Sequence, residues 1–273
     1  MTTLRAHLTA LRDRSRTALG LFVTSGFPDP AGTGDVLDAV ADGGADFVEL
    51  GMPFSDPLAE GLPIQRSSAR ALGHGTVMAD AFRTAEAFAR RHPDVPLVLM
   101  GYVNPVVQYG VGAFCRDAAQ AGASGLILPD LPPAEADLVD ADAAAAGLGM
   151  TYLVAPNTPA GRVRRVAERS TGFVYAVSSP GLTGGALDSP DAITGYLDRT
   201  RALVDAPLLV GFGIRTPQDA ARLAPHADGV IVGSALIEHV EAAWDDPALG
   251  AAARRASVTA WTRALRAGAD GHA

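Results

Sequence analysis

The sequence predicts an α/β fold: a (β/α)8 TIM barrel with an extra N-terminal helix and a phosphate-binding helix N-terminus after the eighth strand. Eight short apolar runs alternate with alanine-rich amphipathic segments, with Gly, Pro or Asp at the junctions. The runs do not alternate apolar with polar residues, which is typical of parallel strands buried on both faces. The length of 273 residues also suits one such barrel.

The eight apolar runs are the expected strands. They lie at residues 19–23, 47–50, 97–100, 125–128, 150–154, 173–177, 208–210 and 229–232. Amphipathic stretches are expected to form helices at residues 34–42, 79–91, 111–121, 134–146, 160–169, 217–223, 235–240 and 258–266, with an extra helix at 3–16 ahead of the barrel. The whole chain, residues 1–273, is interpreted as one domain with a frayed tail at 267–273.

A doubly wound open sheet is the alternative arrangement of the same alternating units. Members of that class that bind dinucleotides carry a Gly-x-Gly-x-x-Gly fingerprint after the first strand. Here Val23 leads through Thr24, Ser25 and Gly26 to Pro28, so the fingerprint is missing. The closed barrel is therefore favoured.

Charge and cysteine content restrict the partners and the compartment. The formal net charge is −8, without a basic cluster that could follow a phosphate backbone, so nucleic acid is not an expected partner. Cys115 is the single cysteine, which excludes a disulfide within the chain and favours a reducing compartment. No apolar run approaches the roughly 20 residues that span a bilayer, and no signal peptide is recognisable. A cytoplasmic protein without membrane contact is expected.

Glycine-rich segments follow the seventh and eighth expected strands. Gly211, Phe212 and Gly213 come after the seventh, and Gly233 and Ser234 come after the eighth, where a helix opens. In barrels of this class, phosphate sites recur after these two strands. Glycine lets backbone N–H groups approach an anion closely, and a helix N-terminus adds unpaired donors. The segments could simply form tight turns, but two of them at neighbouring strand ends favour a phosphate-binding site.

Two carboxylates lie in or near the second expected strand. Glu49 stands inside that apolar strand, where a carboxylate needs a partner or a shifted pKa. A salt bridge to a neighbouring strand is the alternative, but the chain contains no Lys and the other expected strands carry no Arg. Glu60 belongs to the following loop, a position where most Glu side chains are merely solvated. Together the two acids suit general acid–base chemistry, because different surroundings can separate their pKa values.

Other polar residues give weaker signals. The Gly-rich loop 178–185 after the sixth expected strand is either an ordinary connection or a lid over a ligand, and the lid is favoured. The six His residues show no metal-ligand spacing, so no metal site is expected. Ser55 and Ser178 lack the surroundings of an acylated serine nucleophile. Asp130 suits a positioning or capping role.

Seven strings along the chain resemble the tryptophan synthase α-subunit family. The longest is VELGMPFSDPLAEGLPIQ from Val48 to Gln65, which looks like the family's signature around its catalytic glutamate. The others are PLVLMGYVNPV, GLILPDLPPAEA, YLVAPNTP, SSPGLTGG, LLVGFGIRTPQDA and ADGVIVGSALI, beginning at Pro96, Gly125, Tyr152, Ser178, Leu208 and Ala227. The resemblance covers residues 19–237 and is too extended to be accidental.

The resemblance implies a lyase that cleaves indole-3-glycerol phosphate to indole and glyceraldehyde 3-phosphate in tryptophan biosynthesis, with no cofactor in this chain. It makes Glu49 the acid–base residue that acts at indole C3 and at the glycerol hydroxyl. The family's aspartate near the indole N–H falls at Glu60, which keeps the charge but adds a methylene group, a change that can lower the rate. The other implied contacts are Phe22, Ile64 and Met100 to the indole, Tyr175 to the glycerol, Thr183 to a catalytic carboxylate on lid closure, and Gly184, Gly213, Gly233 and Ser234 to the phosphate.

The resemblance also implies a partner. The family's α subunit docks on a pyridoxal-phosphate-dependent β subunit in an α2β2-type complex, through loops that correspond to Pro53, Asp56, Pro57, Asn104 and Pro132. The pyridoxal phosphate would belong to that β partner. Two alternatives stay open: a stand-alone lyase that releases free indole, and a catalytically weak α-like subunit that regulates a β partner. An unrelated phosphosugar enzyme with the same phosphate site is disfavoured by the VELGMPFSDP string.

Overall fold

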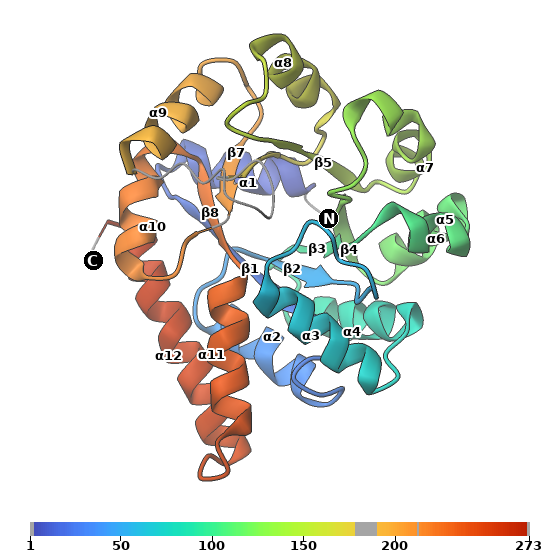
Figure 1. The fold of residues 1–273 in the computed structure, drawn as a ribbon, viewed down its shortest axis with the longest axis vertical. Coiled ribbons are helices and arrows are strands. Elements are labelled where there is room, and N and C mark those ends of the chain that lie inside the picture. Colours follow the sequence, from blue (N-terminus) through green and yellow to red (C-terminus); the bar gives the residue numbers. More distant parts are fainter. Residues whose placement is uncertain (1–2, 178–189, 212, 272–273) are drawn as a thin grey trace.

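The computed structural model describes residues 3–177, 190–211 and 213–271 as a closed parallel barrel. Each strand pairs in parallel with the next, and β8 pairs with β1 to close the sheet (Figure 1). The strands are β1 (Ala18–Thr24), β2 (Phe47–Gly51), β3 (Leu97–Met100), β4 (Ala123–Ile127), β5 (Gly149–Val154), β6 (Val174–Val177), β7 (Leu208–Gly211) and β8 (Gly229–Val232). The expected fold class is confirmed.

Helices alternate with the strands and surround the barrel (Figure 1). They are α1 (Leu4–Asp13), α2 (Gly32–Asp42), α3 (Leu62–Gly73), α4 (Met78–Arg91), α5 (Val103–Tyr109), α6 (Val111–Gln120), α7 (Asp140–Ala145), α8 (Ala160–Arg169), α9 (Pro190–Arg201), α10 (Pro217–Leu223), α11 (Ser234–Asp245) and α12 (Ala251–Ala269), with 3-10 turns η1 (Pro133–Leu138) and η2 (Ala224–His226). Among these described helices, none combines the length and the apolar character needed to cross a membrane.

Most expected elements lie where the apolar pattern predicted them. Strands β3 and β8 and helices α8 and α10 have the expected bounds, and the ends of the other strands differ by one or two residues. Helices α3 and α5 were not expected, whereas α9 follows the sixth strand, where a helix was expected without stated bounds. The reason is clear for α3, because the face that it buries includes Ser67 and Ser68 beside Ile64 and Ala71. Small polar residues on a buried face weaken the hydrophobic period that reveals a helix.

One expected helix is wrong, because residues 134–146 do not form a single helix. They begin as the 3-10 turn η1 and continue as α7 only after an interruption at Val139, whose φ is −127°. Ala136 and Val139 are both fully buried. The backbone at Val139 leaves the helical region while its side chain stays buried, so the segment is divided at this residue.

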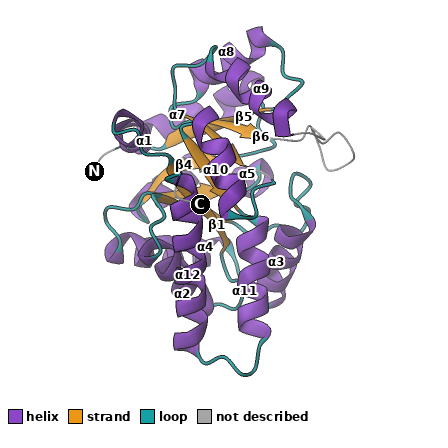
Figure 2. Ribbon diagram, turned by 90° about the vertical axis from the view of Figure 1, so that its left-hand side faces the viewer, coloured by secondary structure: helices purple, strands orange, loops and turns teal. Residues whose placement is uncertain are grey.

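The end of the chain packs against the closed, N-terminal end of the barrel. Helix α12 continues to Ala269 and so includes the first three residues of the expected tail. Arg266 anchors it, because its guanidinium donates 2.6–3.0 Å hydrogen bonds to Asp46 and Asp270. Asp46 also accepts a 2.8 Å hydrogen bond from the Leu19 amide of β1. Helix α1 lies at this same end, away from the tips of the strands (Figure 2).

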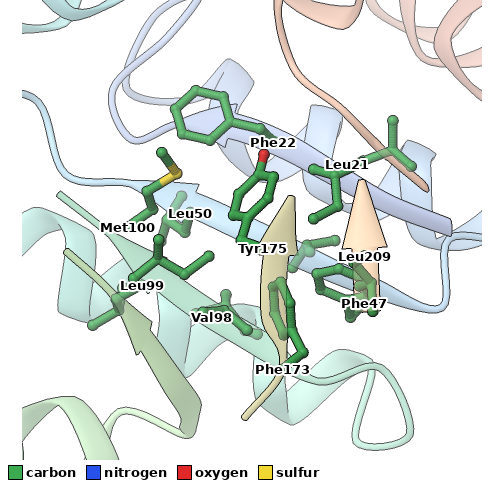
Figure 3. Close-up of a cluster of buried hydrophobic side chains, with 14 of the residues drawn as sticks. Leu21, Phe22, Phe47, Leu50, Val98, Leu99, Met100, Phe173, Tyr175 and Leu209 are labelled. Carbon is green, nitrogen blue, oxygen red and sulfur yellow. The ribbon is translucent and has the colours of Figure 1, made fainter. Parts of the chain in front are cut away.

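Two aromatic side chains occupy space that glycines leave near the carboxyl ends of the strands. A Cβ atom at Gly51 would lie 2.4 Å from the Phe22 ring, and one at Gly211 would lie 2.2 Å from the Tyr175 hydroxyl oxygen. Figure 3 shows Tyr175 with its hydroxyl group directed towards Phe22. Both rings can therefore reach over the barrel axis and form the floor of a cavity at the carboxyl ends of the strands.

Candidate active site

A cavity of about 340 Å³ opens at the carboxyl ends of the strands. Its wall is formed by Phe22, Glu49, Glu60, Leu62, Pro63, Ile64, Met100, Tyr175, Gly213, Ile214, Arg215, Ile231, Gly233, Ser234, Ala235 and Glu238. Catalytic, substrate-binding and phosphate-binding residues were expected from the sequence. All of those that the structure describes lie in this wall. Thr183 and Gly184, and the expected lid at 178–185, lie outside the described residues.

Glu49 lies within β2, paired with Phe22 of β1 on one side and Val98 of β3 on the other. Its side chain is fully buried, and neither carboxyl oxygen has a hydrogen-bond partner among the described residues. Burial, with a smaller contribution from the nearby Glu60 carboxylate, raises the pKa of Glu49 to about 8. A buried carboxyl group without a partner indicates a functional site, because the protein otherwise gains nothing from burying it.

Glu60 lies in the loop between β2 and α3 and is only 4% exposed. Burial raises the pKa of Glu60 to about 7, and its Oε2 atom has no hydrogen-bond partner among the described residues. Its main chain is held on two sides: the amide donates to the Pro57 carbonyl at 3.1 Å, and the carbonyl accepts from Gln65 Nε2 at 2.9 Å. The preceding Ala59 amide donates to the Tyr102 hydroxyl at 2.9 Å. The main chain of this loop is therefore fixed, although Oε2 of the carboxyl group has no partner among the described residues.

Sequence reasoning missed the roles of Gln65 and Tyr102. Gln65 closes the VELGMPFSDPLAEGLPIQ string and Tyr102 is part of PLVLMGYVNPV, so both were within recognised motifs. Nothing in either string shows that the two side chains meet the same loop. Only the packing of α3 and the β3 end against that loop reveals it.

Both carboxyl groups have raised pKa values, so each can hold or release a proton near neutral pH. Burial raises the pKa of Glu49 to about 8, with a further contribution from Glu60, and burial raises the pKa of Glu60 to about 7. One group can then donate a proton while the other stabilises a developing positive charge. Such a pair is the usual arrangement for acid–base catalysis at neutral pH.

Apolar side chains surround the carboxyl groups and define a slot for a flat, apolar group. Phe22, Ile64, Met100 and Tyr175 were expected there, and Ile231 of β8 adds to them. Ser67 Oγ donates to the Ile64 carbonyl at 2.8 Å within α3 and lies 2.6 Å from Thr24 Oγ1 of β1, a contact that joins the first turns of α3 to the barrel. An aromatic ring bound in this slot would lie in an apolar environment that strengthens its interactions with the carboxyl groups.

Backbone donors for an anion line the same cavity. Gly213 has a φ of +78°, a conformation that glycine adopts freely. Helix α11 starts at Ser234, and its N-cap residue Gly233 provides no side-chain cap. The first amides of the helix therefore have no intrahelical partner and face the cavity end where Gly213, Gly233 and Ser234 meet.

The residues expected to face a partner lie on the loops around this end of the barrel. Asp56 and Asn104 are exposed, and Pro53, Pro57 and Pro132 are partly exposed. Apolar side chains among them are also exposed, with Leu58 at 76% and Leu138 at 47%. Asp130 accepts hydrogen bonds of 3.0 and 3.2 Å from the Val103 amide and so joins two of these loops, which agrees with its expected capping role. An apolar rim of this kind is typical of a docking surface.

Metal binding has no support in the described part of the chain, which contains no group of three or more His, Cys, Asp or Glu residues able to hold an ion. The histidines there have other contacts. His92 lies 2.9 Å from Asp38 and His226 lies 2.7 Å from Asp198, both on the outside of the barrel.

Comparisons with known proteins agree on one family. The family model described as tryptophan synthase alpha chain matches residues 8–266. The tryptophan synthase alpha chain of Rhizorhabdus wittichii is 45% identical over 238 residues, which cover 87% of this chain and 88% of that protein. The crystal structure of tryptophan synthase subunit alpha from Legionella pneumophila superposes with a TM-score of 0.89 at 36% identity, covering 99% of both chains. A chain of tryptophan synthase from M. tuberculosis, in an aminoacrylate-bound form, has a TM-score of 0.85 at 35% identity, covering 98% of this chain and 99% of that one.

Proposed function

The chain belongs to the tryptophan synthase alpha chain family, and from that premise we propose that Glu49 and Glu60 carry out the family's reaction in the cavity described above. The reaction is the retro-aldol cleavage of indole-3-glycerol phosphate to indole and glyceraldehyde 3-phosphate, a step of tryptophan biosynthesis. One observation carries the assignment of residues. The buried carboxyl group of Glu49 has no hydrogen-bond partner among the described residues, and it shares an apolar cavity with Glu60, a second carboxyl group whose pKa is raised.

Protonated Glu49 donates its proton to C3 of the indole, which converts the ring to an indolenine with positive charge on nitrogen. The Glu60 carboxylate stabilises that charge and accepts a hydrogen bond from the ring N–H. The Glu49 carboxylate then takes the proton of the glycerol hydroxyl next to C3. As the carbonyl forms, the bond between C3 and the glycerol carbon breaks, and its electron pair returns to the ring to neutralise the nitrogen. Glu49 ends the cycle protonated, as it began.

The rest of the cavity holds the substrate in register. Phe22, Ile64 and Met100 pack on the indole, and Tyr175 lies beside the glycerol. The phosphate binds to the backbone amides at Gly213, Gly233 and Ser234, where the α11 N-terminus favours negative charge. Thr183 and Gly184, outside the described residues, are proposed to complete the site from the lid. This alignment places C3 within reach of Glu49 and the ring nitrogen near Glu60.

The family's alpha chain acts as a subunit with a beta subunit, which carries the pyridoxal phosphate, and it needs no cofactor of its own. We further propose an α2β2-type complex in which the loops with Pro53, Asp56, Pro57, Asn104 and Pro132 contact the β subunit. The exposed apolar residues on these loops support that surface. The chain is proposed to work as one domain in the cytoplasm, where its single thiol stays reduced.

The test is the rate of indole release from indole-3-glycerol phosphate by the purified chain, alone and with a tryptophan synthase β subunit. Release that the β subunit stimulates strongly is the expected result, because docking on the loops next to Glu60 completes the site. Rapid release without stimulation would instead identify a stand-alone lyase. Absence of release under both conditions, with the substrate still bound, would contradict the assignment of Glu49 and Glu60 and favour a regulatory subunit.

The pH dependence of kcat/KM is expected to be bell-shaped, with its maximum between about pH 7 and pH 8. Activity falls below the pKa of Glu60, about 7, because that carboxyl group must be ionised. It falls above the pKa of Glu49, about 8, because that group must start protonated. Initial rates of indole release from pH 5 to pH 10 measure both limbs. A rate that keeps rising above pH 9 would show that Glu49 does not act first as an acid.

A further inference from the structure

The cavity as a whole is electrically unusual for a site that binds an anion. In the described part of its wall, Glu49, Glu60 and Glu238 are acidic and Arg215 alone is cationic. Arg215 follows the seventh strand, directly after Gly213 and Ile214, and Glu238 lies on α11. A phosphate group carries about −1.5 to −2 charge near neutral pH, so the position of the one cation decides how well it is tolerated.

Arg215 and Glu238 form an ion pair between their side chains. Glu238 is four residues after Ser234, so both lie on the same face of α11, one turn apart. The guanidinium of Arg215 therefore lies alongside the first turn of the helix, whose free amides are the phosphate donors. The main chain of Arg215 is itself fixed, because its amide donates to Asp219 at 3.1 Å within the capping box of α10.

We propose that Arg215 is a phosphate-binding residue of this enzyme and that Glu238, which pairs with the same guanidinium, weakens phosphate binding by repulsion. This inference rests on the proposed function, since it assigns a further residue to the same phosphate site. An arginine has five N–H donors in a planar fork, so it can turn one edge to the phosphate while the other edge keeps its contact with Glu238. The carboxylate of Glu238 then limits affinity by repulsion, whereas Arg215 raises it.

The proposal predicts opposite effects for the two halves of the ion pair. Arg215→Ala is expected to raise the KM for indole-3-glycerol phosphate by about tenfold with kcat changed less than about twofold, because binding of the distant phosphate is the same in the ground and transition states. Glu238→Gln is expected to lower KM by about threefold, because the amide oxygen can still hold the guanidinium without repelling the phosphate. The effects are modest because the Arg215 and Glu238 side chains are 59% and 36% exposed, and they should be measured at low ionic strength.

Arg222→Ala is the matched control. Arg222 lies on α10, is absent from the cavity wall and pairs at 3.0 Å with Asp219 Oδ1, whereas the Arg215 amide donates to Asp219 Oδ2, so its removal deletes one positive charge nearby and leaves that hydrogen bond in place. Its KM should stay within about twofold of the parent value. If the Arg215–Glu238 pair only joined α11 to the preceding loop, both single variants would lower the melting temperature and shift KM in the same direction or not at all. That result would overturn the proposal.

A binding experiment separates this inference from the proposed reaction. The affinities of inorganic phosphate and glycerol 3-phosphate for the parent chain and the three variants can be measured by ³¹P NMR without any turnover. Weaker binding to Arg215→Ala and tighter binding to Glu238→Gln would support the role of Arg215 even in a chain that released no indole. Indole release by the parent chain together with unchanged phosphate binding in both variants would refute the role of Arg215 and leave the proposed reaction intact.

Discussion

Replacing Glu49 with Gln is expected to lower the rate of indole release by about a thousandfold or more, while the affinity for the phosphorylated substrate stays nearly unchanged. Gln has almost the shape of Glu but can neither donate a proton to indole C3 nor take one from the glycerol hydroxyl. Glu60, the other carboxyl group close to Glu49 in the described cavity wall, is proposed to act at the ring nitrogen and so does not take over this role. Single-turnover indole release and equilibrium binding of glycerol 3-phosphate measure the two quantities.

The stability of Glu49→Gln provides an internal control for folding. The pKa of Glu49 rises from 4.5 to about 8 on burial, so its protonated form favours the fold at low pH, and that contribution is lost as the pH rises through about 8. Gln does not ionise, so the variant should match the parent near pH 4.5 and become increasingly more stable towards pH 8. Thermal unfolding at several pH values measures this difference. Near-parental activity in a stable variant would remove Glu49 from the mechanism.

Replacing Glu60 with Gln is expected to lower kcat by about a hundredfold, because the positive charge that develops on the indole nitrogen loses its carboxylate. The change is electrostatic rather than structural, since the hydrogen bonds to Pro57, Gln65 and Tyr102 that fix the loop all use main-chain atoms of residues 59 and 60. The acid limb of the pH profile should disappear in this variant, because the group that titrates at about 7 is gone. Initial rates from pH 5 to pH 10 test both effects.

Glu60→Asp is the matched variant that separates the effect of the carboxylate charge from the effect of side-chain length. Asp is the residue that the family resemblance implies at this position, and it keeps the carboxylate but shortens its reach by one methylene group. We expect it to retain activity within about tenfold of the parent, because a small displacement weakens the contact with the ring N–H without removing the charge. If Gln and Asp at position 60 lowered kcat equally, the carboxylate charge would not be the reason for the effect, and Glu60 would have only a spatial role.

Some roles could be predicted from the sequence without the structure, because residue type and local position are enough to suggest them. Glu49 is a carboxylate inside an apolar run in a chain without Lys, and burial of such a group demands an explanation. Gly213, Gly233 and Ser234 follow strands seven and eight, whose positions are predicted by the apolar pattern. Both features depend on one segment at a time, so sequence reasoning could reach them.

The contacts that join separate segments could not be predicted in the same way. Tyr102 accepts a hydrogen bond from the amide of Ala59, which is 43 residues away in the sequence. Arg215 pairs with Glu238, which is 23 residues away. Tyr and Arg at these positions would look the same on any exposed surface. The break at Val139 is a similar case, because the choice between a 3-10 turn and a helix depends on which neighbours bury Ala136 and Val139.

The sequence by itself therefore determined the barrel, the order of its strands and the family, and it predicted the principal acid, because each follows from local periodicity, from a charge in an apolar run or from an extended motif. The tertiary structure alone decided the surroundings of the candidate site. Burial raises the pKa values of both Glu49 and Glu60, glycines at 51 and 211 leave room for Phe22 and Tyr175, and Arg215 pairs with Glu238 of α11. The physical reason is that desolvation, close approach and charge pairing depend on distances between segments, which no local pattern encodes.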